Sequence, residues 1–189
     1  MGLNPGTFLY RLRSIITGFG FRKAIPGIGI GSLRDSDGTI LTGATEPKRA
    51  SLETTFEGVV STAGQTDLGT LQFVIPGDYD ATNDVLKVRF LAQSAGTDVP
   101  AIDATLYRKR EGAAISSDLG PTISGAINTV TALADWVEID CSGLSLLPGD
   151  AISMDFTLDA HASHDADIYG LEVIYSSDLV YYYSADRAG

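Results

Sequence analysis

The segment from Asp159 to Asp167 holds both histidines of the chain and three carboxylates. Imidazole nitrogens and carboxylate oxygens bind divalent cations, so His161, His164, Asp165 and Asp167 form a candidate metal set. Their spacing matches no common metal-binding motif, and a polar hairpin tip between two strands accounts for the same residues. We therefore predict no metal and no other cofactor, and we keep this set as the alternative.

Cys141 is the single cysteine and the other candidate for covalent chemistry. It falls on the apolar side of an alternating segment, where a buried thiol is inert. One cysteine also excludes an intrachain disulfide framework and a cysteine-based zinc site. The sequence contains no nucleophile elbow, phosphate-binding loop or dinucleotide fingerprint. We therefore predict that the protein is not an enzyme and that it has no catalytic residue.

Two segments, Ile75–Asp78 and Leu147–Asp150, each end in Pro-Gly-Asp. Their aspartates could act as ligands. Proline followed by glycine also suits the two central positions of a type II turn, because glycine adopts the positive φ that the turn requires. We interpret both segments as turns that precede or follow strands.

Period-two alternation of apolar and polar residues predicts the elements that position these groups. The predicted strands lie within residues 52–60, 71–75, 86–92, 102–106, 137–141, 152–158 and 171–175. No helical pattern is long enough to connect parallel strands. The sequence therefore predicts an all-β, antiparallel β-sandwich of the jelly-roll type, formed by residues 50–189 and preceded by an extended N-terminal arm, residues 1–49.

Charge divides the chain at the same place. The 189 residues carry a net charge of −11, but residues 1–49 hold seven basic and three acidic side chains, whereas the remainder holds six and 21. Such asymmetry is typical of an interaction arm on a separately folded body. The residues predicted to bind a partner are Phe8, Leu9, Arg11, Leu12, Arg13, Ile15, Ile16, Arg22 and Lys23.

The negative charge of residues 50–189 argues against nucleic acid as a partner. Arg108–Arg110 is a basic triplet, but we interpret it as a solvated hairpin turn because the surrounding body would repel phosphate. Nucleic acid is therefore not a predicted partner. No run of about 18 apolar residues is present, so a membrane partner is not predicted either.

Apolar residues near both ends of the sequence predict that the chain associates with copies of itself. The arm has large apolar residues without a periodic partner in its own segment, and Tyr181, Tyr182 and Tyr183 follow the last predicted strand. Tyrosine is enriched at protein interfaces. Cyclic symmetry would close every such surface, so we predict a homotrimer in which the three tyrosines form contacts between copies.

Trp136 is the only tryptophan, and it lies at the start of a predicted strand. An exposed tryptophan on a jelly roll is a typical site for sugar binding. We expect this side chain in the core, and its exposure would favour the alternative of a carbohydrate-binding module.

The segment Leu71–Tyr183 resembles small β-sandwich virion proteins of tailed bacteriophages, the cement or decoration proteins that bind capsids. The resemblance rests on residues 86–90 (LKVRF), 104–110 (ATLYRKR), 147–150 (LPGD) and 169–173 (YGLEV). It implies a non-enzymatic structural protein on the capsid surface, with the major capsid protein as partner of the arm. The alternatives are a carbohydrate-binding jelly-roll module and a receptor-binding phage tail protein.

Overall fold

A computed structural model describes residues 21–43, 47–53, 56–94, 96, 100–120, 125–127, 133–159 and 163–178. Within these residues the chain forms ten strands and one short 3-10 helix. They are β1 (Phe21–Ala24), η1 (Ile30–Ser32), β2 (Lys48–Glu53), β3 (Phe56–Ser61), β4 (Asp67–Val74), β5 (Leu86–Ser94), β6 (Ala101–Lys109), β7 (Gly125–Ala126), β8 (Asp135–Asp140), β9 (Ala151–Asp159) and β10 (Ala166–Ser177). Among the residues described, no helix has the length and apolar character needed to cross a membrane.

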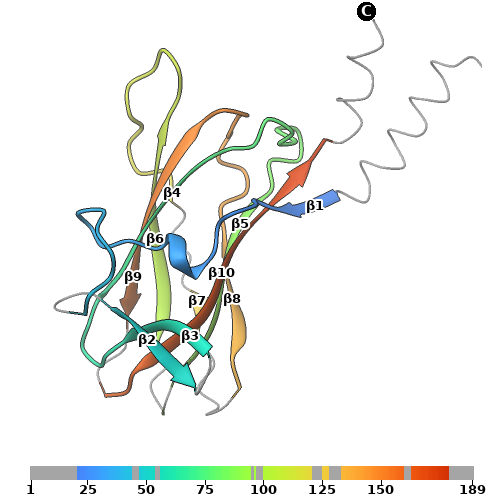
Figure 1. Cartoon of the computed structure of the whole chain (residues 1–189). Coiled ribbons are helices and arrows are strands. Elements are labelled where there is room, and N and C mark those ends of the chain that lie inside the picture. Colours follow the sequence, from blue (N-terminus) through green and yellow to red (C-terminus); the bar gives the residue numbers. More distant parts are fainter. Residues whose placement is uncertain are drawn as a thin grey trace, which may run out of the picture.

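The strands form two antiparallel sheets (Figure 1). Sheet A has the order β2-β3-β10-β5-β8, and β1 also pairs with β10, beyond the part that pairs with β3. Sheet B has the order β4-β9-β6-β7. The four-strand orders β3-β10-β5-β8 and β4-β9-β6-β7 are those of a jelly roll. The predicted fold class is therefore confirmed.

The core lies between the two sheets and follows from the alternation along each strand. In β5 and β9 every second side chain is buried, which places one face of each strand inward. Phe90 from β5 meets Phe156 from β9 edge to face, with ring centroids 5.0 Å apart. Such pairs add to the stability that comes from burying the rings themselves.

Part of the predicted arm belongs to the sandwich. β1 continues sheet A, and Leu33 and Leu41 are buried in the same core as the body strands. Arg34 and Thr70 exchange two backbone hydrogen bonds of 3.0 and 2.6 Å, which covers part of the β4 edge. The predicted boundary after Arg49 lies within β2, because the apolar residues of this segment complete the body's own core.

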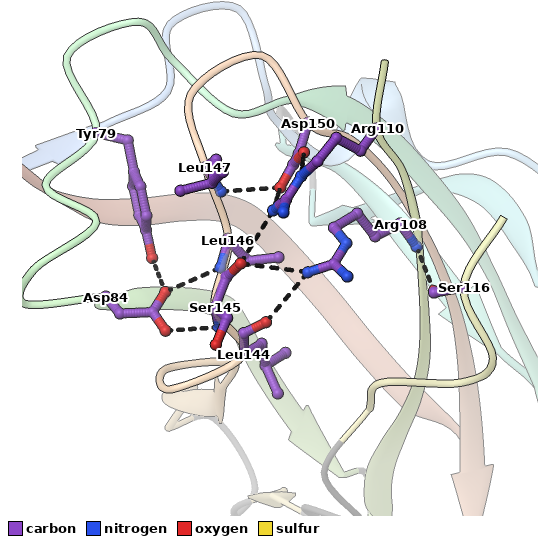
Figure 2. Close-up of polar contacts among 10 residues, drawn as sticks. All are labelled: Tyr79, Asp84, Arg108, Arg110, Ser116, Leu144, Ser145, Leu146, Leu147 and Asp150. Carbon is purple, nitrogen blue, oxygen red and sulfur yellow. Dashed lines mark hydrogen bonds and ion pairs between the residues drawn. The ribbon is translucent and has the colours of Figure 1, made fainter. Parts of the chain in front are cut away.

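The connection from β8 to β9 is held by ionic contacts (Figure 2). Asp150 is almost fully buried and accepts hydrogen bonds of 2.7 and 2.6 Å from the guanidinium of Arg110 and one of 2.8 Å from the Leu147 amide. Burial alone would raise the pKa of Asp150, but these donors hold it below the usual carboxyl value.

Arg108 of the basic triplet donates to the carbonyls of Leu144 and Ser145 in the same connection. The basic triplet is therefore not a solvated turn, because two of its three side chains fix this loop.

Candidate functional site: the outer face of sheet A

Several predicted site residues lie outside the described residues. These are the arm residues Phe8, Leu9, Arg11, Leu12, Arg13, Ile15 and Ile16, together with His161 and Tyr181, Tyr182 and Tyr183. Arg22 and Lys23 lie in β1. The Lys23 ammonium forms an ion pair with the carboxylate of Asp78 in this chain, at 2.5 Å. Binding of a partner by Arg22 and Lys23 stays a prediction.

The remaining members of the candidate metal set do not converge. His164 packs against Gly96, Asp165 accepts a hydrogen bond of 3.0 Å from the Ala63 amide, and Asp167 lies in β10. Across the part of the chain that the structure describes, no group of three or more His, Cys, Asp or Glu side chains could hold a metal ion.

The outer face of sheet A brings together residues from four strands. Leu91 in the central strand β5 lies opposite Trp136 in β8 on one side and Gly170 in β10 on the other. Beyond Gly170, the ring of Tyr169 meets the ring of Phe56 in β3 at a centroid distance of 5.5 Å. We call Phe56, Leu91, Trp136 and Tyr169 the aromatic face.

A β-bulge in β10 creates this arrangement. The register between β10 and β5 shifts between Ile168 and Gly170. A bulge adds one residue to a strand and re-aims a side chain. Here it leaves Ile168 buried and directs Tyr169 toward Phe56, while Gly170 has no side chain beside Trp136.

Trp136 is 43% exposed and Phe56 is 47% exposed. The expectation of a core tryptophan is therefore wrong. The physical reason is strand parity: Val137 and Ile139 point inward, so Trp136 points outward. The guanidinium of Arg89 lies over the indole ring, 4.6 Å from its centroid, and this cation–π contact orients the ring.

Polar groups border the aromatic face on one side. The Gln93 amide donates a hydrogen bond of 2.7 Å to the Tyr169 hydroxyl, and Gln93 lies opposite Asp167 in the β5–β10 ladder. Burial raises the pKa of Asp167 above the usual carboxyl value, and nearby Asp165 adds to this shift, although a hydrogen bond from Gln93 opposes it. This border offers hydrogen-bond acceptors, the Asp167 carboxylate and the Gln93 carbonyl, beside exposed rings.

Ion pairs border the other side. Arg89 pairs with Glu172, and Lys87 pairs with Glu138 and with Asp140. Both cations on this border are therefore already neutralised by carboxylates of the neighbouring strands. The arrangement gives an apolar strip with hydrogen-bonding groups on one side and a charge-compensated border on the other.

The outer face of sheet B carries a different feature, a groove of about 390 Å³. Its floor is formed by small residues of the central strand β9, Ala151 and Ser153. Larger side chains of the two neighbouring strands stand on either side; they are Gln72 and Val74 in β4 and Tyr107 and Lys109 in β6. Ile115 also lines the groove, next to Ser116, whose amide donates to the Arg108 carbonyl of β6. We call this the sheet B groove.

Comparisons with known proteins give structural matches only. No family model and no curated protein sequence matches the chain. Similar structures include the xylan-binding CBM22-1 domain of Paenibacillus barcinonensis Xyn10C, with 12% identity over 79% of this chain and 94% of that one and a TM-score of 0.44. A CBM61 domain in complex with β-1,4-galactotriose gives 15% identity over 64% and 71%, with a TM-score of 0.37.

A further match is the K1 adhesin domain of Lys-gingipain from Porphyromonas gingivalis W83, with 13% identity over 81% of this chain and 96% of that one and a TM-score of 0.37. At these scores the matches assign no function. The function must therefore be inferred from the residues of this chain.

Proposed function

We propose that the protein binds carbohydrate without cleaving it and that the aromatic face is the binding site. The observation that carries this proposal is the exposure of Trp136 and Phe56 on one sheet face, beside the hydrogen-bonding pair Gln93 and Asp167. An isolated exposed aromatic residue needs no explanation, but a group of them bordered by polar residues is typical of a binding surface.

The chemistry of a sugar ring matches both parts of this face. The C–H groups on one side of a pyranose ring are apolar and pack against aromatic rings, while its hydroxyls lie around the rim. Asp167 can accept hydrogen bonds from those hydroxyls, and so can the carbonyl oxygen of the Gln93 amide. The aromatic face therefore supplies the packing surface, and its polar border orients the sugar.

Charge favours a neutral sugar. Arg89 and Lys87 are paired with carboxylates, and Asp167 adds a further acidic group at the opposite border. A uronic or sialic acid would bring its own carboxylate close to Asp167, and the two cations of the opposite border, Arg89 and Lys87, are already paired. Like charges in such proximity oppose binding.

The test is Trp136→Ala, compared with Leu147→Ala as a control. Leu147 lies in the β8–β9 connection and is 43% exposed, like Trp136, so its truncation removes exposed apolar surface away from the aromatic face and from the sheet B groove. On an array of neutral and acidic oligosaccharides, we expect wild type and Leu147→Ala to bind the same neutral sugars. Loss of a central aromatic contact costs about 2 kcal/mol, so Trp136→Ala should bind about 30-fold more weakly.

The intrinsic fluorescence of the wild-type chain gives an independent measurement, because Trp136 is its only tryptophan. The emission of the free protein should be that of a solvent-exposed indole and should shift to shorter wavelength when sugar binds. Equal binding by wild type and Trp136→Ala would contradict the proposed site, and no binding by wild type would contradict the function.

Attachment to a phage capsid stays a prediction from the sequence resemblance, as do the virion location and the major capsid protein as partner. The two roles separate experimentally. Capsid attachment through the arm should be unchanged in Trp136→Ala, whereas sugar binding through the aromatic face should be about 30-fold weaker.

A further inference from the structure

The outer face of sheet B changes character along its length. At one end lies the sheet B groove, where Val74 and Ile115 are 57% and 67% exposed. Further along β9 comes Asp155, between Thr70 of β4 and Thr105 of β6, and then Thr157, between Asp67 and Asp103. An apolar groove therefore leads directly into an acidic surface.

The charge of this surface is one-sided. The outward positions of β4, β9 and β6 carry four acidic residues, Asp67, Asp103, Asp155 and Asp159. Lys109 is the one basic residue at these positions, and Arg108 also lines the groove. Both already donate to backbone carbonyls, Lys109 to Ala113 at 2.6 Å and Arg108 to Leu144 and Ser145. A complementary partner must therefore combine large apolar side chains with basic ones and must lack acidic ones.

The first 20 residues of this chain have that composition. They contain six large aliphatic or aromatic side chains close together, interspersed with two arginines, and the first acidic residue of the sequence is Asp35. The residues concerned are Phe8, Leu9, Tyr10, Leu12, Ile15 and Ile16, with Arg11 and Arg13. Apolar side chains suit the groove, and arginines suit the aspartates beyond it.

We propose that the outer face of sheet B binds residues 8–16 of a second copy of this chain, with Ile15 and Ile16 in the groove and the arginines over the aspartates. Each copy then carries one groove and one segment, so neighbouring copies can bind one another in turn. A copy that filled its own groove would stay monomeric, so the mass of the wild-type protein separates the two arrangements.

Light scattering of the full-length protein at moderate salt tests the assembly. The wild-type mass should be a multiple of 19.9 kDa and should fall as salt screens the charges. Ala151→Trp fills the floor of the groove at an exposed strand position and should give a monomer. Val60→Trp adds the same bulk to the outer side of sheet A and should assemble like wild type.

A mixing experiment tests the identity of the occupant. Arg11→Glu combined with Arg13→Glu leaves the groove open but reverses the charge of the segment, and this variant should be monomeric. Mixed with Ala151→Trp, which retains a normal segment, it should form a 1:1 complex, because one groove and one segment remain compatible. A monomeric wild type, or two variants that do not combine, would overturn the proposal. Because Trp136 is on the other sheet, failure here leaves sugar binding unaffected.

Discussion

At the scale of single residues, the two Pro-Gly pairs of this chain adopt different backbones. Gly149 has a φ of +86°, and the amide of Asp150 donates to the Leu147 carbonyl at 3.1 Å. This is the predicted type II turn. Gly77 lies outside the left-handed region, and its turn closes one residue later, at the amide of Tyr79. The same prediction is therefore wrong for the first pair, and only one of the two glycines needs its conformational freedom.

Alanine at the two positions should have opposite effects on stability. An added Cβ meets no atom within 4 Å at either glycine, so conformation alone decides the outcome. Gly149→Ala forces a side chain into the left-handed region and should lower the free energy of unfolding by about 1 kcal/mol. Gly77→Ala should be neutral or stabilising by up to about 1 kcal/mol. Urea midpoints at constant m-value measure both changes, and equal midpoints for the two variants would contradict this account.

At the scale of elements, β1 depends on a cluster around one carboxylate. Asp78 accepts hydrogen bonds from the Lys23 ammonium at 2.5 Å, the Ser177 hydroxyl at 2.7 Å and the Tyr175 hydroxyl at 2.8 Å. Partial burial alone would raise the pKa of Asp78, but these donors and the lysine charge lower it to about 2. The four-residue strand is thus joined to β10 by backbone pairing and to Asp78 by an ion pair.

The stability of β1 should therefore depend on pH in the acid range. Because the pKa of Asp78 is lower in the folded state than in the unfolded one, its contribution is complete above about pH 4 and is lost as the pH falls toward 2. The Ile25 amide, which donates to Val173 at 2.8 Å, should lose protection from hydrogen exchange over this range. In Asp78→Asn it should be poorly protected at every pH, and unchanged protection in that variant would contradict the role of Asp78.

The strands differ in how well the sequence predicts them. The strand predicted at 152–158 differs from β9 by one residue at each end, because alternating burial gives a half-exposed strand a clear pattern. β1 has no such pattern, since its four residues gain order from pairing with β10 far along the chain. The outward direction of Trp136 was predictable from Val137 beside it. The approach of Tyr169 to Phe56 was not, because it depends on the bulge in β10.

At the scale of the whole molecule, Cys141 reports on the opening of the sandwich. Its side chain is fully buried, as predicted, and burial with a contribution from Asp140 raises the pKa of the thiol to about 12. In the native state at pH 8, a thiol-specific reagent should not react except through opening of the core. The labelling rate should rise with urea with a slope close to the global m-value, and labelling independent of urea would indicate a local opening instead.

The position of β10 has a consequence for synthesis on the ribosome. It lies between β3 and β5 in sheet A, yet it is the last strand of the described chain. At about 5–20 residues per second, the roughly 80 residues that separate the end of β5 from the end of β10 take about 4–16 s to appear. Throughout that interval, the edges of β3 and β5 that later pair with β10 are exposed and can pair with other chains. Sheet A can close only once β10 has been synthesised, so until then the nascent chain must be kept from pairing with its neighbours.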